Sequence, residues 1–359
     1  MNFSDRQKKL IKFLRGGSLD AFLVRKKENI AYLTGARGED AVLFISAGNI
    51  VLITDSRYEE EYKKTAEKCS VRVAGSKNIW EIIAEACVET HSKSIGFEAD
   101  SFTYRAYESL KKRLGHRKLI PLTAAVENLR IIKDKSEIQD IRQACKYGVQ
   151  LMNYAVKAAK PGVSENSVKA AIEAYALKNN IKLANFDIIV ASGVNASMPH
   201  AVASERRIKK QEMVVIDLGA AHLSYNSDLT RTVFLGKINH NYLAAYNIVL
   251  ASQAMAIESL RPGIYAKDVD AVSRRYISDR GMGGFFLHSL GHGIGRETHE
   301  IPAISQSSKI KLEQGMVITI EPGVYIPGWG GVRIEDTVLI TANGCEILTK
   351  GAVKYAGRN

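Results

Sequence analysis

The chain has 359 residues, of which 46% are apolar and 25% are charged, and its formal net charge is +12. This length exceeds the usual size of one domain, so it predicts a globular protein with two domains, each with a sizeable core. No segment is apolar enough to span a bilayer, and the N-terminus lacks the apolar run and cleavage site of a secretory signal. These features disfavour a membrane or secreted protein and predict a cytoplasmic location.

Strand-like and helical patterns alternate in the first third of the chain. Apolar runs of strand length begin at 21, 41, 49, 70 and 93, and helical patterns cover 4–15, 57–67, 78–91 and 101–115. The alternation predicts an α/β domain with a mixed sheet, and Ala47-Gly48-Asn49 between two of the runs predicts a hairpin within it. We find no glycine-rich phosphate loop in this part and interpret it as a supporting or substrate-covering domain.

A basic cluster, KKRLGHRK at 111–118, carries the densest positive charge. Lysine and arginine neutralise phosphates, so such a cluster is one mark of a nucleic-acid interface. Residues 101–114, however, also form the pattern of an amphipathic helix with a serine cap, and the solvated face of that helix accounts for the same charges. We therefore expect no nucleic-acid partner.

The pattern of the first domain breaks around Pro121, and a long helical stretch begins near Ser136. This break is the best domain boundary in the chain. It predicts an N-terminal domain at 1–122, a linker at 123–134 and a second domain at 135–359.

The second domain groups its helices beside strands. A stop at Pro161-Gly162 and a capping region at 164–166 separate the first two helices, and strand patterns follow. Two more helices are predicted at 239–261 and 267–281, before a last set of strands. This grouping predicts an α+β domain.

Two aspartates lie in the β-like stretch VVIDLGAAHLSYNSDLTRTVF. A hairpin centred between His222 and Leu223 would set Asp217 opposite Asp228. Opposed residues on one sheet face have β-carbons roughly 4.5–5.5 Å apart, close enough for two carboxylates to share a cation. The alternative is that Asp228 lies in a turn and that Asp217 accepts a hydrogen bond at a strand end.

A second carboxylate pair is predicted in the hairpin EPGVYIPGWGGVRIE. Its turn falls at Pro327-Gly328, with Glu321 and Glu335 equidistant from Gly328. Both glutamates follow β-branched apolar residues, where an ionised side chain is costly without a partner. Arg333 could pair with one glutamate, but a single arginine cannot satisfy four carboxylates.

Three histidines, His288, His292 and His299, lie close together in HSLGHGIGRETHE. The segment departs from the dinucleotide fingerprint, because Arg296 stands where glycine is required, and from HExxH zinc proteases, because the second histidine is missing. Each histidine alone is more often structural than functional. His200 follows a buried strand in a loop of small residues, where a substrate-handling role and a capping role are both open.

The spans IDLGAAHLSYNSDLTRTV, HSLGHGIG with the following HE, ITIEPGVY and GGVRIEDTV resemble, in order and spacing, the pita-bread metallopeptidases of the aminopeptidase P and prolidase branch. The resemblance covers residues 135–359. The N-terminal part is similar to the creatinase-type domain of that branch. The resemblance thus implies an α/β creatinase-type N-terminal domain followed by an α+β pita-bread catalytic domain.

The same resemblance implies a hydrolytic site with two divalent metal ions. Asp228 and Glu335 would bridge the ions, Asp217 would bind one ion, and His292 and Glu321 would bind the other, with Glu321 also moving a proton. Oxygen ligands with one imidazole favour manganese, with cobalt, iron or zinc as substitutes, because no thiolate is present to impose zinc. The ions would convert a shared water to hydroxide, which attacks the carbonyl before the proline nitrogen.

Further residues receive roles from the resemblance alone. His299 would steady the carbonyl oxygen, His200 would hold the peptide on its leaving side, and His288 would line the proline pocket. Tyr325 and Arg333 would brace the ligand carboxylates and relay protons.

The resemblance leaves two substrate preferences open. Prolidases carry an arginine shortly after the His-Glu pair, whereas this chain has Ala303 in HEIPA. A site without that cation should tolerate a longer peptide, so we predict an Xaa-Pro aminopeptidase that acts on small peptides with proline at the second position. Lys309 and Lys311 could replace the cation, which keeps the Xaa-Pro dipeptidase, prolidase, as the alternative.

A metal-free binding module on the same fold is the remaining alternative. It is disfavoured because such relatives usually lose metal ligands, and this chain retains all five. Relatives of this size commonly pair, so a homodimer is expected.

Overall fold

The computed structural model describes residues 2–354 and divides the chain into two compact units, Met1–Arg130 and Ile131–Asn359. The division falls within the predicted linker 123–134, whose limits stay a prediction. Among the described residues, no helix combines the length and the apolar character needed to cross a bilayer.

The first unit is built on a six-stranded mixed sheet in the order β4-β3-β2-β1-β5-β6. Its strands are β1 (Ala21–Val24), β2 (Val42–Ser46), β3 (Ile50–Thr54), β4 (Ser70–Val73), β5 (Ser94–Glu98) and β6 (Lys118–Leu122). Its helices are α1 (Phe3–Gly16), α2 (Lys27–Thr34), α3 (Glu59–Thr65), α4 (Ile79–Glu89), α5 (Tyr104–Leu114) and α6 (Glu127–Arg130). The predicted hairpin at 47–49 is confirmed, since β2 pairs with β3 in antiparallel register.

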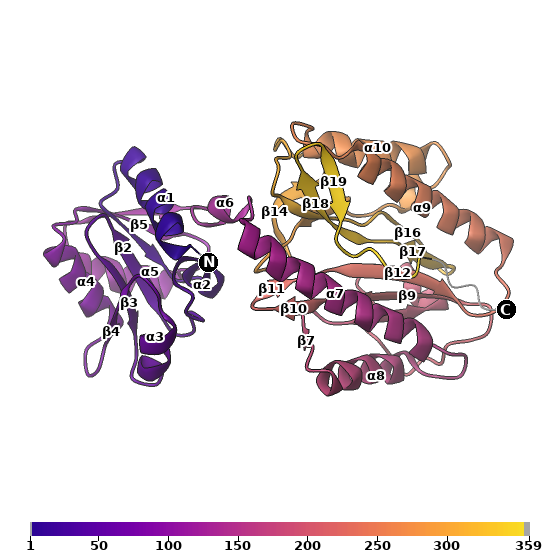
Figure 1. Ribbon diagram of the computed structural model, residues 1–359, viewed down its shortest axis with the longest axis horizontal. Helices are drawn as coiled ribbons and strands as arrows, with labels where there is room; N and C mark the ends of the chain where they lie inside the picture. Colours follow the sequence, from indigo (N-terminus) through magenta and orange to yellow (C-terminus); the bar gives the residue numbers. More distant parts are fainter. Residues whose placement is uncertain (1, 355–359) are drawn as a thin grey trace. The chain divides into compact units, whose positions relative to one another are not determined.

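The sheet of the first unit is buried on both faces. Successive side chains of a strand point to opposite faces. On β1, Phe22 therefore packs in the core that α1, α2 and α3 cover, and Leu23 packs in the core beneath α4 and α5. The unit is thus an α/β domain, as predicted, and its helices form a layer on each face of the sheet (Figure 1).

Several local features of the first unit differ from the sequence prediction. Helix α2 and strand β6 were not predicted, and the cap of α5 is Thr103 rather than a serine, because the Thr103 side chain accepts from the N–H of Ala106. Pro121 lies inside β6 rather than after the sheet. An edge strand tolerates proline, since one side of its backbone has no strand to pair with.

The second unit has two pairs of helices and several small antiparallel sheets. Its helices are α7 (Lys135–Ala158), α8 (Glu165–Lys178), α9 (His240–Ser259) and α10 (Ala266–Ser278), with short 3₁₀ turns η1 (Gly193–Ser197) and η2 (Gly283–Phe285). Its first strands are β7 (Lys182–Leu183), β8 (Ile189–Ser192), β9 (Met213–Leu218), β10 (Ala220–His222), β11 (Tyr225–Asn226) and β12 (Leu229–Phe234). The later strands are β13 (Gly291–Gly293), β14 (Glu300–Ile304), β15 (Val317–Ile320), β16 (Gly323–Ile326), β17 (Gly330–Arg333), β18 (Asp336–Thr341) and β19 (Gly344–Ile347).

The two largest cores of this unit lie on either side of its strands. One lies between α7, α8 and the sheet β12-β9-β8, and the other between α9, α10 and the sheet β14-β13-β15-β18-β19. The strands thus lie between two helix pairs, which is the predicted α+β arrangement (Figure 1). Asp134 caps α7 in a capping box with Glu137, so this helix begins near Ser136 as predicted.

Candidate metal centre

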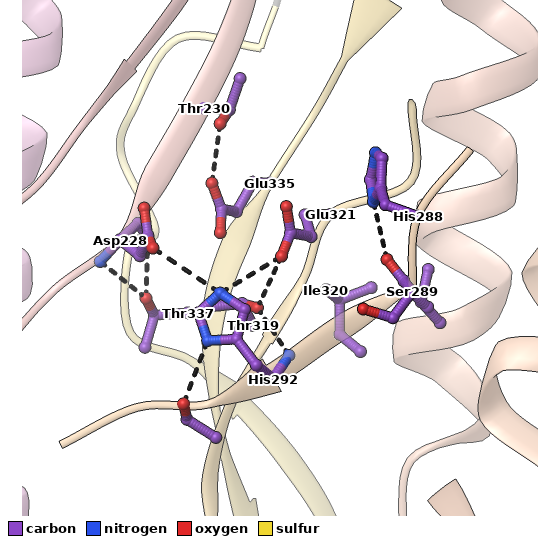
Figure 2. A network of polar contacts seen from close by, with 12 residues as sticks. Asp228, Thr230, His288, Ser289, His292, Thr319, Ile320, Glu321, Glu335 and Thr337 are labelled. Atoms are coloured by element: carbon purple, nitrogen blue, oxygen red, sulfur yellow. Dashed lines mark hydrogen bonds and ion pairs between the residues drawn. The ribbon is translucent and has the colours of Figure 1, made fainter. Parts of the chain in front are cut away.

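Strand ends of the second unit bring the predicted ligands together. Asp217 lies near the end of β9, Asp228 just before β12, His292 in the middle of β13, Glu321 just after β15 and Glu335 between β17 and β18. Figure 2 shows the side chains of Asp228, Glu321, Glu335 and His292 turned toward a common centre.

The first hairpin has a different register from the predicted one. Asp217 pairs with Thr230 rather than with Asp228, and the turn is centred between Leu223 and Ser224. Both turn residues have positive φ, at 46° and 65°, as a two-residue type I′ turn requires. The shift is two positions, so Asp228 keeps the strand face that the prediction gave it but stands diagonal to Asp217.

The second hairpin has the predicted register. Gly323 pairs with Arg333 in β16 and β17, and Ile320 pairs with Asp336 in β15 and β18. Both pairings are centred on Gly328, whose φ of 74° suits glycine. Glu321 and Glu335 are therefore equidistant from that turn, as predicted.

His292 presents one ring nitrogen to the carboxylates. Its Nδ1 lies 3.0 Å from the carbonyl oxygen of Gly293, and since a carbonyl only accepts, Nδ1 carries the proton of the neutral ring. Nε2 then points its lone pair toward Glu321 Oε1 at 3.3 Å and Asp228 Oδ2 at 3.8 Å. A lone pair that faces two anionic oxygens requires a positive charge between them, from either a proton or a metal ion.

The pKa shifts of the clustered side chains also indicate that the centre needs positive charge. Burial lowers the pKa of His292, but Glu321 and Asp228 outweigh it and raise that pKa to about 9. Burial and the charge of Asp217 raise the pKa of Asp228 well above its ordinary value, and burial and the charge of Asp228 do the same to the pKa of Glu335. Without a cation, these carboxylates cannot all be ionised together.

Among the described residues, two fully buried carboxylate oxygens have no hydrogen-bond partner, and both belong to predicted ligands. Asp217 Oδ1 and Glu335 Oε1 are buried and accept no hydrogen bond, whereas the second oxygen of each accepts from Arg333 or Thr230 at 2.7 Å. Asp228, His292 and Glu335 each contribute one potential ligand atom, and these three atoms lie within 4.8 Å of one another. Buried oxygens without donors, next to this cluster, fit a divalent cation.

Arg333 pairs with an aspartate rather than with a glutamate. Its Nη2 donates to Asp217 Oδ2 at 2.7 Å. Its Nη1 donates to Tyr325 Oη at 2.8 Å and to the Pro199 carbonyl at 3.1 Å. Its Nε donates to Thr230 Oγ1 at 3.1 Å. Burial lowers the pKa of Arg333, but Tyr325 and Asp217 outweigh it and raise that pKa well above its ordinary value. Arg333 therefore remains a cation beside the centre.

His288 lies beside the centre in a single tautomer. Its Nδ1 donates to the Ser289 carbonyl at 2.7 Å, so its Nε2 accepts from Tyr325 Oη at 2.9 Å, and Tyr325 in turn accepts from Arg333. Burial lowers the pKa of His288 and favours the neutral ring. Phe286 packs edge-on against that ring.

The other two histidines are exposed. The ring of His299 lies 4.2 Å from that of His292, and burial and the charge of His292 lower the pKa of His299. His200 lies on the segment between η1 and β9, one residue after the Pro199 carbonyl that Arg333 contacts.

Three threonines support the carboxylates and were missed in the sequence. Thr230 donates to Glu335 at 2.7 Å, Thr319 to Glu321 at 3.3 Å, and Thr337 to the carbonyl of Asp228 at 2.8 Å. Each threonine stands two residues from one of the carboxylates, in DLT, TIE and EDT. That spacing puts both side chains on one strand face, so it was a usable signal.

Comparisons with known proteins agree with this centre. Residues 139–342 match Metallopeptidase family M24, and residues 6–132 match the Creatinase/Prolidase N-terminal domain. The chain is 40% identical to an Xaa-Pro dipeptidase of Pyrococcus horikoshii over 97% of both chains. It also matches two solved structures: an Xaa-Pro dipeptidase from Bacillus anthracis (TM-score 0.93, 36% identity, 97% of this chain and 98% of that one) and an X-Pro aminopeptidase from Thermotoga maritima (TM-score 0.89, 32% identity, 98% and 100%). The chain therefore belongs to Metallopeptidase family M24 and is a peptidase, with a creatinase-type N-terminal domain before a pita-bread catalytic domain.

Proposed function

We propose that this chain is an Xaa-Pro dipeptidase, which hydrolyses the bond between an N-terminal residue and a C-terminal proline. The observation that carries the proposal is the 40% identity, over 97% of both chains, to an Xaa-Pro dipeptidase. A second dipeptidase of that name, from Pyrococcus furiosus, is 38% identical over 96% of this chain. These relatives favour the dipeptidase over the aminopeptidase that we predicted from Ala303.

The residues of the centre fit divalent metal ions. We assign two ions, manganese by preference, to the ligands Asp217, Asp228, His292, Glu321 and Glu335. The assignment is supported by the donor-free oxygens of Asp217 and Glu335 and by the Nε2 lone pair of His292. When bound, such ions polarise the scissile carbonyl and lower the pKa of a water molecule to near neutrality.

The protein supplies proton transfer and orientation around the scissile bond. Burial raises the pKa of Glu321, but His292 outweighs it and lowers that pKa to about 2, so Glu321 is ionised and can accept a proton at Oε1 and return it to the proline nitrogen. His299, exposed beside His292, donates to the substrate carbonyl oxygen as negative charge develops there. His200 holds the leaving side of the substrate.

The neutral ring of His288 and the ring of Phe286 form an apolar wall that suits the proline side chain. Tyr325 and Arg333 fix this wall to the centre, because one hydrogen-bond chain runs from the Ser289 carbonyl through His288, Tyr325 and Arg333 to Asp217. The chain therefore aligns the wall with a metal ligand.

The aminopeptidase is the second candidate, and one observation favours it. Ala303 pairs directly with His292 across β13 and β14, so its small side chain lies beside the metal ligand where an arginine could have bound a free carboxylate. The absence of a cation at 303 leaves room for a longer peptide.

Initial rates with manganese separate the two candidates. We expect Ala-Pro to be hydrolysed with a higher kcat/KM than Ala-Pro-Ala, and Ala-Ala not to be cleaved. The reverse ranking of the first two peptides would establish the aminopeptidase. If neither peptide is cleaved after loading with manganese, cobalt, iron or zinc, both candidates fail.

Three further expectations accompany the proposal. We expect a homodimer in solution, a cytoplasmic location and no nucleic-acid partner. Light scattering coupled to size-exclusion chromatography tests the first, cell fractionation the second, and a binding assay at physiological salt the third.

A further inference from the structure

The segment that carries His200 has both of its ends on one buried carboxylate. Glu165, the first residue of α8, has no exposed surface. Ser192 at the end of β8 and Ser204 beyond His200 both donate to it. Glu165 thus joins the two ends of the segment 192–204.

Backbone and side-chain donors from three residues meet this carboxylate. Oε1 accepts from the N–H and Oγ of Ser192, both at 2.7 Å, and Oε2 accepts from the N–H of Ser204 at 3.2 Å and its Oγ at 2.7 Å. Asn195, inside the segment, donates from Nδ2 to Oε1 at 3.2 Å and to Oε2 at 3.0 Å. A buried carboxylate with this many donors is stable only in one arrangement of the segment.

The middle of the segment is fixed to the centre. The Pro199 carbonyl accepts from Arg333 Nη1 at 3.1 Å, and Arg333 also holds Asp217. The Ala196 carbonyl lies so close to β17 that a Cβ added at Gly331 would be 2.0 Å from it. His200 therefore stands between one anchor on Arg333 and another on Glu165.

We propose that Glu165 is a positioning residue of the peptidase reaction, which fixes the segment 192–204 so that His200 meets the leaving side of the substrate. The inference rests on the proposed function, in which His200 contacts substrate. Glu165 hydrogen-bonds to Ser192, Asn195 and Ser204, none of which is a proposed metal ligand. Its effect is transmitted through the hydrogen bonds at the two ends of the segment.

The test is Glu165→Gln, which keeps the shape of the side chain. In this variant the amide NH₂, a donor, faces the donor groups of either Ser192 or Ser204. The backbone N–H groups cannot become acceptors, so hydrogen bonds at one end of the segment are lost. A shift of the segment by about 1 Å predicts a fall in kcat/KM for Ala-Pro of about 10- to 100-fold. Bound metal should be unchanged, because no ligand loses a partner.

The matched control is Asn166→Ala. Asn166 is the next residue of the helix and contacts the same part of the chain, donating to Glu205 at 2.7 Å, but on the exposed side. We expect its kcat/KM to stay within about two-fold of the wild-type value, since exposed substitutions have small effects. Both variants are compared by thermal unfolding, so that a loss of folded protein is distinguished from a loss of positioning.

The double variant with His200→Ala separates positioning from a purely structural role. If Glu165 acts through His200, Glu165→Gln lowers kcat/KM by no more than about two-fold in the His200→Ala background. An undiminished effect in that background overturns the inference, and so does a Glu165→Gln variant as active as Asn166→Ala.

Hydrogen exchange of the amides in 193–203 tests the anchoring without any substrate. The exchange should be faster in Glu165→Gln than in the wild type, and equal rates overturn the inference. This result does not depend on whether the protein cleaves any dipeptide. A wild type that cleaves no Xaa-Pro peptide instead defeats the proposed function. If Glu165→Gln does not fold, Ser204→Ala removes a single hydroxyl donor, and the same pattern at smaller amplitude is expected.

Discussion

Thr230 is the residue on which two of the carboxylates of the centre depend. Its hydroxyl donates to Glu335 and accepts from Arg333, which in turn holds Asp217. A threonine is suited to this position because its β-branched side chain has a stiff χ1 and stands fixed on the strand. The orientation of Glu335 thus follows from a side chain that is not a ligand.

We predict that Thr230→Val weakens metal binding by about 10- to 100-fold, the usual effect of removing a partner of a ligand. Valine keeps the shape of threonine but leaves Glu335 Oε2 without its donor. Titration calorimetry with manganese measures the change. Thr341→Val, at the far end of β18, is the control and should bind normally; equal affinity of the two variants would rule out this role of Thr230.

We expect residue 303 to influence how well the free carboxylate of a dipeptide is recognised. Since Ala303 stands opposite His292, we predict that Ala303→Arg raises the ratio of kcat/KM for Ala-Pro to that for Ala-Pro-Ala by about 10-fold, on the scale of one charge-assisted hydrogen bond. Ala303→Leu, of similar bulk but uncharged, is the control. An unchanged ratio in the arginine variant shows that residue 303 does not meet the substrate carboxylate.

At the scale of elements, turn chemistry decided which registers could be predicted. Gly328 marks its turn in the sequence, so counting residues outward from Gly328 gave the correct strand pairing around Glu321 and Glu335. The other turn uses Leu223 and Ser224 at positive φ, where neither residue type is expected, and the predicted centre was misplaced. Alternation alone could not correct it, because a shift of two positions leaves every side chain on the same face.

Contacts between distant segments were beyond such reasoning. The anchoring of Ser192 and Ser204 on Glu165 and the pairing of Arg333 with Asp217 join residues with no common local pattern. The sequence did predict the helix cap near 164–166, but a cap says nothing of what the next side chain will bind. Local patterns therefore predicted the proposed metal ligands better than the residues that hold those ligands and their neighbouring segments in place.

Strand β9 begins beside an ion pair that depends on pH. Burial raises the pKa of Glu212, but hydrogen bonds from Arg206 and the N–H of Lys209 outweigh it and lower that pKa below the ordinary value of 4.5. A lowered pKa means that the carboxylate stabilises the fold above pH 4.5, and that this contribution is lost as the pH falls through the folded-state value.

We therefore predict that Glu212→Gln lowers the free energy of unfolding by about 1 kcal/mol at pH 7 and by less at pH 3.5. Urea unfolding at the two pH values measures the difference. The exposed Glu205→Gln serves as control and should show no such pH dependence. The same loss for Glu212→Gln at both pH values would contradict the ionised pair.

At the scale of the whole molecule, each unit has its own cores, and only the second unit contains the proposed metal ligands. We predict two calorimetric transitions, of which manganese shifts only one to higher temperature. At a manganese concentration 100 times its dissociation constant, the free energy of unfolding of that unit should rise by about 2.7 kcal/mol. Limited proteolysis during heating identifies which unit melts in each transition. A chelator should reverse the shift, and an equal shift of both transitions would contradict independent units.

The spread of the ligands along the chain also sets when the activity can begin. The first unit is finished at residue 130, while the proposed ligands start at Asp217 and end only at Glu335. During synthesis the whole N-terminal unit therefore leaves the ribosome before the last carboxylate of the proposed centre does. A nascent chain that ends before Glu335 therefore lacks part of the proposed centre, and we expect it to have no peptidase activity.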